Sequence, residues 1–149
     1  MTTARFELGT DGPSRILVGV DGSETSLRAG AYAAGLARRQ GSKLIVLYVK
    51  PVPPGPIQAP EAVVAIEQSQ DQIAAELRAT LEGNAARLGL DAELVVRGGN
   101  PYAELLALAE ERKVDAIVVG ASAQAGHRLV GSLASKLVRH ATWPVTVVP

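Results

Sequence analysis

The segment Arg15-Ile-Leu-Val-Gly-Val-Asp-Gly-Ser23 joins a run that is apolar on both faces of a strand to a short polar turn. Continuous hydrophobicity is typical of a parallel strand covered by helices on both sides, whereas a half-solvated antiparallel strand alternates. The hydroxyl of Ser23 is placed to cap the free N–H groups of a following helix. The segment therefore predicts the first strand, turn and helix of a parallel α/β sheet.

Four further segments have strand-like sequences, at 43–49, 92–96, 116–119 and 145–148. Stretches with the 3.6-residue periodicity of helices separate them, which gives the order βαβαβαβαβ. Right-handed crossovers then predict an α/β fold, an open doubly wound five-stranded parallel sheet of order 3-2-1-4-5, Rossmann-like, with helices on both faces. Glu93 places the third strand nearer an edge of this sheet.

Helical periodicity also predicts which side chains face the sheet. These residues are Leu27, Ala31 and Ala34 in the first helix; Ile66, Ile73, Leu77, Leu81 and Leu88 in the second, at about 61–88; Leu105, Leu108 and Ala109 in the third; and Leu133, Leu137 and Val138 in the fourth.

The chain of 149 residues is predicted to form one domain at 15–149, preceded by a polar, flexible leader at 1–14. Fifteen basic and fifteen acidic side chains cancel, so nucleic acid is not an expected partner. Cysteine is absent, and no apolar run approaches the roughly 18 residues of a membrane span. We expect a cytoplasmic protein without a membrane partner. The proline-rich segment 50–60 is predicted to be a loop, which serves either as a lid or only as a spacer between the second strand and the second helix.

A second strand and turn carry the strongest chemical signal. Asp115-Ala-Ile-Val-Val-Gly120 is followed by a loop of small residues and by Gly131-Ser132 at the start of a helix. This layout places free N–H groups around an anion. In the predicted strand order, the turn at Asp21 and the loop 120–132 flank one crevice, across which a nucleotide could lie. The alternatives are that Asp21 only accepts amide hydrogen bonds at the first helix, and that Gly131-Ser132 is only a turn and cap.

With these residues the chain resembles the universal stress protein family from about Arg15 to Val148. The matching features are the opening Ile-Leu-Val-Gly-Val-Asp-Gly-Ser, the long helix after a proline-rich loop, Asp115, Gly131-Ser132 and the closing Pro-Val-Thr-Val-Val. Many members bind ATP, and the resemblance implies ATP, with or without magnesium, as the ligand. It implies that Asp21 and the backbone at Val49 lie near the base and ribose. Around the phosphates it implies Gly120, Gly131, Ser132 and the amides of Leu133 and Ala134.

The loop departs from the pattern Gly-x2-Gly-x9-Gly-[Ser/Thr] typical of ATP-binding members. Ala123 stands at the middle glycine, and ten residues rather than twelve separate Gly120 from Gly131. An alanine methyl costs about 1–2 kcal/mol where the backbone is left-handed. Gly126 is the candidate substitute for the missing flexible point. Two hypotheses follow: a nucleotide-binding regulator of the stress response, or a nucleotide-free dimeric module that acts through protein contacts.

The last strand is the expected dimer interface. It is uncharged and lies at the sheet edge in the predicted order, where it invites pairing. The resemblance implies a homodimer in which this strand continues antiparallel into that of a partner. The residues concerned are Val145, Thr146, Val147 and Val148. The alternative is that the leader of the same chain covers this edge.

Other enzyme classes lack their residues in this sequence. No lysine precedes Ser132 as a Walker loop requires, and the glycines after the first strand are out of register for a dinucleotide-binding turn. The paired acids of a phospho-acceptor receiver and a metal-ligand cluster are also missing. We expect no catalytic residues, and any ATP hydrolysis would be slow because no general base or arginine finger is evident.

Overall fold

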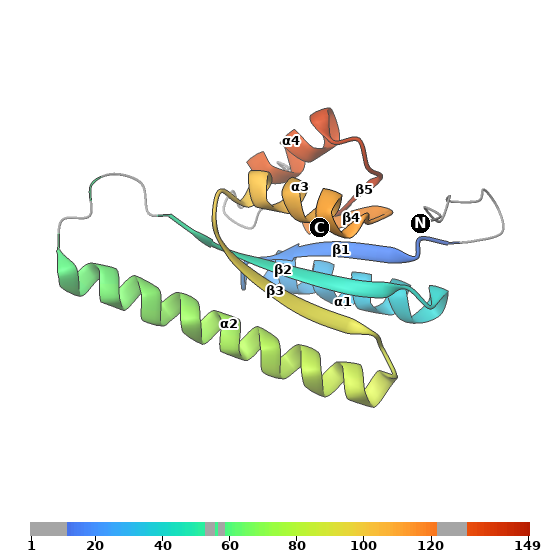
Figure 1. The fold of residues 1–149 in the computed structure, drawn as a ribbon, viewed down its shortest axis with the longest axis horizontal. Helices are drawn as coiled ribbons and strands as arrows, with labels where there is room; N and C mark the ends of the chain where they lie inside the picture. Colours follow the sequence, from blue (N-terminus) through green and yellow to red (C-terminus); the bar gives the residue numbers. More distant parts are fainter. Residues whose placement is uncertain (1–11, 53–55, 57–58, 122–130) are drawn as a thin grey trace.

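The computed structural model describes residues 12–52, 56, 59–121 and 131–149, which form one parallel sheet with helices on both faces (Figure 1). The strands are β1 (Arg15–Val20), β2 (Lys43–Pro51), β3 (Ala92–Gly99), β4 (Ala116–Gly120) and β5 (Val145–Val148). The helices are α1 (Glu24–Gln40), α2 (Pro60–Leu88), α3 (Pro101–Arg112) and α4 (Ser132–His140). The five strands are ordered β3-β2-β1-β4-β5 and every neighbouring pair is parallel. The predicted fold class and strand order are confirmed.

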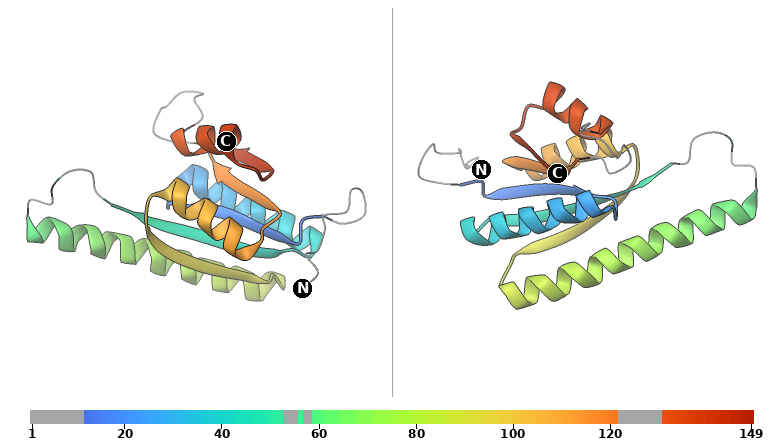
Figure 2. Two further views of the ribbon diagram at one scale, coloured as in Figure 1. Left: turned by 45° about the horizontal axis from the view of Figure 1, so that its top comes forward. Right: turned by 180° about the vertical axis from the view of Figure 1, so that it is seen from behind.

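The core consists of two apolar layers, one on each face of the sheet. Helices α1 and α2 cover one face and α3 and α4 the other (Figure 2). Alternate side chains of β1 enter different layers, because Leu17 packs toward α3 and α4 whereas Ile16 and Val18 pack toward α1 and α2. All three are completely buried. The apolar run of β1 is thus explained by burial on both faces.

Three of the four predicted helix faces need correction. Helix α1 presents Ala29, Ala33 and Ala37 to the sheet, while the predicted Leu27 is 47% exposed. Ala31 is also exposed and Ala34 only partly buried. Alanine lies on several sides of this helix, so the pattern of small residues does not select one face.

In α4 the side chains of Ala134 and Leu137 are buried and Leu133 is partly buried. The predicted Val138 is 62% exposed. By contrast, the predicted face of α3, formed by Leu105, Leu108 and Ala109, is confirmed, since all three are buried.

Helix α2 packs on the core from Ile73 to Ala85. Ile73, Leu77 and Leu81 contact the core, but Ile66 is 37% and Leu88 39% exposed, so the predicted stripe is wrong at its two ends. A helix of 29 residues is about 43 Å long, whereas the adjacent strand β3, of 8 residues, spans about 26 Å. The start of α2, with Ile66, therefore extends beyond the sheet (Figure 1). At the other end Ala85 still packs on the core, and Leu88 lies on an exposed side of the last turn.

Strand β2 continues past the end of β1. Its pairing with β1 ends at Val20↔Tyr48, whereas its pairing with β3 continues to Pro51↔Gly99. An ion pair of 2.6 Å between Lys50 Nζ and Asp71 Oδ1 joins this extension to α2. The side-chain amide of Gln70 (Nε2) also donates to the backbone carbonyl of Pro51 at 3.0 Å. These contacts place α2 beside the free end of β2.

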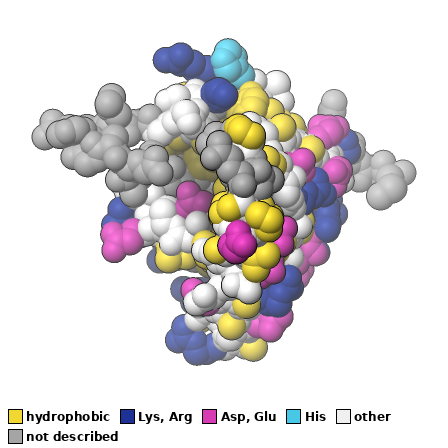
Figure 3. All heavy atoms as spheres, turned by 90° about the vertical axis from the view of Figure 1, so that its left-hand side faces the viewer, with side chains coloured by type: hydrophobic (Ala, Val, Ile, Leu, Met, Phe, Trp, Pro, Cys, Tyr) yellow, Lys and Arg dark blue, Asp and Glu magenta, His cyan; other side chains and the backbone are white. Residues whose placement is uncertain are grey.

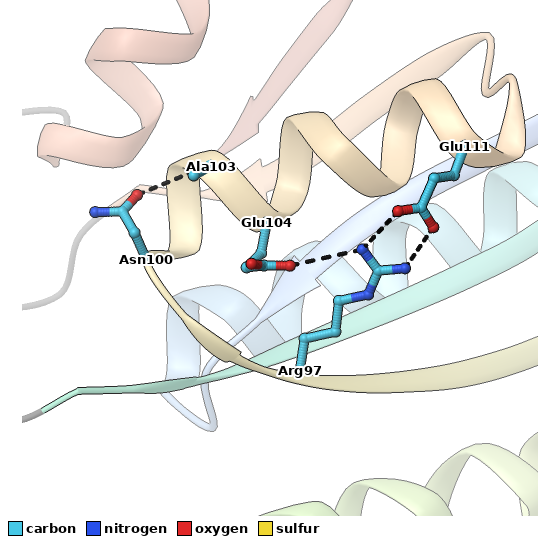
Figure 4. A network of polar contacts seen from close by, with 5 residues as sticks. All are labelled: Arg97, Asn100, Ala103, Glu104 and Glu111. Carbon is cyan, nitrogen blue, oxygen red and sulfur yellow. Dashed lines mark hydrogen bonds and ion pairs between the residues drawn. The ribbon is translucent and has the colours of Figure 1, made fainter.

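Ion pairs fasten the edge strand β3 to α3 (Figure 4). The guanidinium of Arg97 contacts Glu111 at 2.5 Å and Glu104 at 3.6 Å. The carboxylate of Glu111 holds the pKa of Arg97 above its usual value, and the same bond lowers the pKa of Glu111. Asn100 Oδ1 caps α3 by accepting from the amide of Ala103 at 3.0 Å. Arg97 lies on an edge strand, where a charge discourages pairing with another chain.

The domain boundary predicted near residue 15 stays a prediction, and most of the predicted leader lies outside the described residues. Within the described part, the carboxylate of Asp115 accepts from Ser14 N at 2.9 Å, Ser14 Oγ at 2.8 Å and Arg15 N at 3.0 Å. The carbonyl of Pro13 accepts from Ser42 Oγ. Asp115 therefore joins the start of β1 to the start of β4.

Candidate functional site

The carboxyl ends of β1 and β4 are adjacent, and a cavity of about 290 Å³ lies between them. We call it the α4 pocket. Its lining comes from the turn after β1, the first turn of α1, the end of β4 and the first turn of α4. The residues are Gly19, Val20, Asp21, Ser23, Thr25, Ser26, Gly120, Ala121, Gly131, Ser132, Leu133 and Ala134.

A second cavity, of about 640 Å³, lies between the extension of β2 and helix α2. We call it the α2 pocket. Its lining residues are Asp21, Tyr48, Val49, Pro51, Ala65, Ile66, Ser69, Gln70, Ile73 and Pro101. Asp21 lines both pockets, so the two adjoin at this residue. Their volumes are close to or within the roughly 300–1,000 Å³ of small-molecule sites.

The structure brings together most of the residues predicted from the sequence. Those expected around phosphates, namely Gly120, Gly131, Ser132, Leu133 and Ala134, all line the α4 pocket. Val49, expected near the base, lines the α2 pocket. Gly126 lies outside the described residues. In the space-filling view of this end of the molecule, apolar and acidic side chains lie together in the middle of the face (Figure 3).

The first turn of α4 is the strongest candidate for binding an anion. Ser23 caps α1 and Asn100 caps α3, each through a side-chain oxygen. The residue at the corresponding position of α4 is Gly131, and no side chain among the described residues caps this helix. The first N–H groups of a helix lack partners within it and carry the positive end of its dipole. The first turn of α4 thus directs amide donors and a positive dipole end toward the α4 pocket.

Gly120 allows β4 to lie directly against the first turn of α1. A Cβ added to Gly120 would lie 2.6 Å from the carbonyl carbon and oxygen of Thr25 and 2.8 Å from the amide nitrogen of Ser26. These neighbours are backbone atoms, which cannot rotate away. Packing against α1 is thus sufficient reason for a glycine here, whether or not a phosphate binds nearby.

Asp21 is held by the start of α1. Its Oδ1 accepts from the amide of Ser23 at 2.8 Å, and its own amide donates to Ser26 Oγ at 3.1 Å. Burial raises the pKa of the Asp21 carboxyl, but hydrogen bonds from Ser23 and Ser26 outweigh it, so this pKa is lowered overall. The carboxylate is therefore ionised at neutral pH and accepts hydrogen bonds only. The predicted amide hydrogen bond at the start of the first helix is confirmed, and Asp21 also lines both pockets.

The lowered pKa of Asp21 predicts a loss of stability in acid. A carboxyl with a folded-state pKa below its unfolded value of about 3.9 stabilises the fold above that pH, and this contribution disappears as the pH falls through the folded value. We expect the free energy of unfolding of Asp21→Asn to depend less on pH than that of the wild type below about pH 4. Urea unfolding from about pH 6 to about pH 3 measures this. Equal acid dependence in both proteins would contradict it.

The sequence interpretation missed several residues that line the pockets: Thr25 and Ser26 in the α4 pocket, and Tyr48, Ser69, Gln70 and Ile73 in the α2 pocket. One signal was available in the sequence. Tyr48 carries a hydroxyl within the apolar run of β2, between Leu47 and Val49. The side chains of α2 could not be assigned because their approach depends on how far β2 extends beyond β1.

The described residues contain no group of three or more His, Cys, Asp or Glu side chains arranged to hold a metal ion. Among the helices that the structure describes, none combines the length and hydrophobicity needed to cross a bilayer.

Comparison with known proteins identifies the family. The model of the universal stress protein family matches residues 13–149. The universal stress protein YxiE of Bacillus subtilis is 31% identical, covering 91% of this chain and 98% of the relative. The solved structure of UspA from Lactobacillus plantarum is 26% identical, with a TM-score of 0.73, covering 91% of this chain and 97% of that one.

Solved members with this fold include nucleotide complexes. A universal stress protein in complex with cAMP is 27% identical, with a TM-score of 0.60, covering 93% of this chain and 98% of that one. Two others, 20% and 22% identical and similar in fold, contain AMP and dAMP. From the match of the family model over residues 13–149 and the 31% identity to a member along nearly its whole length, the chain belongs to the universal stress protein family.

Proposed function

We propose that this protein is a cytoplasmic, nucleotide-binding regulator of the stress response that binds ATP at the carboxyl end of its sheet and acts as a dimer. The observation that carries the proposal is the position of Asp21, which joins a pocket at the uncapped start of α4 to a second pocket beside α2. One pocket suits an anion and the other suits the larger, less polar nucleoside. The adenine nucleotides bound by relatives of the same fold support this choice.

Charge sets the orientation of the nucleotide in this proposal. Asp21 is negative and repels phosphate, whereas the first turn of α4 carries the positive end of a helix dipole. The phosphates therefore lie against Gly131, Ser132 and the amides that follow. The nucleoside extends past Asp21 into the α2 pocket, where the carboxylate accepts hydrogen bonds from its donors.

A regulatory role is proposed rather than catalysis. The residues lining the two pockets within the described chain include neither a histidine nor an arginine. A general base and an arginine finger are the usual groups that accelerate phosphoryl transfer to water. Any hydrolysis at this site would thus be slow compared with nucleotide exchange.

A second candidate function is a dimeric module that acts through protein contacts without a nucleotide. The observation that favours it is β5, whose described pairing is with β4 alone and which contains no charged residue. Such an edge suits antiparallel pairing with the β5 of a second copy through Val145, Thr146, Val147 and Val148. Both candidate functions include the dimer, so only a test of nucleotide binding distinguishes them.

Titration with ATP and magnesium separates the two candidates. A ligand that binds only the folded state at a hundred times its dissociation constant adds about 2.7 kcal/mol of stability, which raises the melting temperature by about 5–10 °C in a chain of this size. We expect such a rise with ATP and none with magnesium alone. The absence of any shift with millimolar ATP, ADP, AMP or cAMP would refute nucleotide binding and leave the second candidate.

A further inference from the structure

Tyr48 occupies an unusual position in the wall of the α2 pocket. It lies near the end of β2, between Val20 of β1 and Val96 of β3 in the register of the sheet. Its side chain is only 2% exposed and packs in the apolar layer beneath α1 and α2. The same side chain borders the α2 pocket together with Asp21, Ser69 and Gln70.

The hydroxyl of Tyr48 has no hydrogen-bond partner among the described residues of the protein. That hydroxyl is not one of the buried polar atoms left without a partner, so it stays accessible at the wall of the α2 pocket. Phenylalanine would fill the same space in this layer without the hydroxyl. Packing therefore accounts for the aromatic ring of Tyr48 and leaves its hydroxyl unexplained.

Tyr48 and Asp21 line the same pocket, and nearby charges act on the Tyr48 hydroxyl. Burial raises the pKa of Tyr48, and the charges of Lys50, Asp21 and Asp71 also act on it. The phenol is thus protonated at neutral pH and acts as a donor. Asp21, ionised and on the same pocket, acts as an acceptor. Together they form a donor–acceptor pair facing one cavity.

We propose that the hydroxyl of Tyr48 donates a hydrogen bond to the nucleoside part of the bound nucleotide, beside the acceptor that Asp21 provides. This inference rests on the proposed nucleotide binding and assigns Tyr48 as a specificity-determining residue of the same site. The pair matches a group that combines an acceptor with a donor. A ribose hydroxyl is one such group, and the adenine edge, with its amino group and ring nitrogens, is another.

The test is Tyr48→Phe, which removes the hydroxyl and keeps the ring. We expect the dissociation constants of adenosine, AMP and ATP to rise by the same factor, about 3- to 10-fold, because the lost bond is to the part that the three share. The melting temperature without ligand is expected to stay equal or to rise. Tyr32→Phe is the matched control, since Tyr32 lies on α1, is 48% exposed and lines neither pocket.

Adenosine analogues locate the atom that accepts the bond. The 2′-deoxy, 3′-deoxy and 7-deaza forms each remove one candidate acceptor. The form that lacks the true acceptor binds more weakly to the wild type but loses no further affinity in Tyr48→Phe, because the two changes remove one shared interaction. Additive losses for all three forms would overturn a contact with these atoms.

The outcomes distinguish this inference from the function on which it rests. If the wild type binds no nucleotide, nucleotide binding is refuted and the role of Tyr48 with it. If the wild type binds and Tyr48→Phe binds equally well, the role of Tyr48 alone is overturned. A loss confined to ATP would place the hydroxyl at the phosphates and also overturn the nucleoside contact. A lower melting temperature with unchanged affinity would indicate a structural role instead.

Discussion

Replacing Gly120 with alanine is expected to lower the free energy of unfolding by about 2–3 kcal/mol and the melting temperature by about 5–10 °C. The added Cβ would lie 2.6 Å from the backbone of Thr25, a separation that side chains do not adopt. Relief requires the start of α1 or the end of β4 to move, which disturbs packing between β4 and the small face of α1. Thermal and urea unfolding of the variant without any ligand measure the effect.

The matched control is Gly83→Ala on α2. No atom lies within 4 Å of a Cβ built at Gly83, and this glycine is in the interior of a helix. Alanine there is expected to raise stability by about 0.5–1 kcal/mol, because it reduces the entropy of the unfolded chain and favours the helix. A Gly120→Ala variant as stable as the wild type would show that the end of β4 is not held against α1 as described.

The second large effect is expected from Gly131→Glu, which should weaken ATP binding more than about 100-fold while leaving the fold intact. The carboxylate would enter the α4 pocket, where it repels phosphate and offers an acceptor to the amides that the phosphates need. The backbone of Gly131 has φ −62° and ψ 165°, which any residue adopts. A negative charge also suits the start of a helix, so stability should be retained.

Adenosine provides an internal check on this variant. It has no phosphate, so its affinity for Gly131→Glu is expected to match that for the wild type, in contrast to the uniform loss expected in Tyr48→Phe. Gly83→Glu adds the same charge far from both pockets and is expected to bind ATP normally. Retained ATP affinity in Gly131→Glu, measured by calorimetry on a variant with a wild-type circular dichroism spectrum, would place the phosphates elsewhere.

The arrangement of strands follows from the sequence because strands that are apolar on both faces indicate a parallel sheet covered by helices on both sides. Ile16, Leu17 and Val18 are all apolar since each is covered by a helix on one side of the sheet or the other. The alternation of such strands with helices then restricts the topology through the handedness of the crossovers. The capping role of Ser23 was equally accessible, because it depends on residues only three positions apart.

The helix faces were harder to predict where composition was uniform. Alanine lies on several sides of α1, and only contact with the sheet decides that Ala29 and Ala33 are buried while Ala31 is not. In α2 the apolar stripe begins before the helix reaches the sheet, so Ile66 is exposed, and Leu88 lies on an exposed side of the last turn. Periodicity reports which residues share a face, but not whether another element reaches them.

Part of the candidate site was predictable from the sequence and part was not. Hydrophobic runs and local hydrogen bonds are enough to predict the parallel sheet, the turn at Asp21 and the Gly131-Ser132 start of α4. Three other features could be read only from the folded chain: β2 extends beyond the end of β1, Tyr48 borders the pocket beneath α2, and Gly120 lies against the backbone of Thr25. Those contacts join residues from separate elements, and their distances are set by packing of the whole sheet rather than by any local pattern.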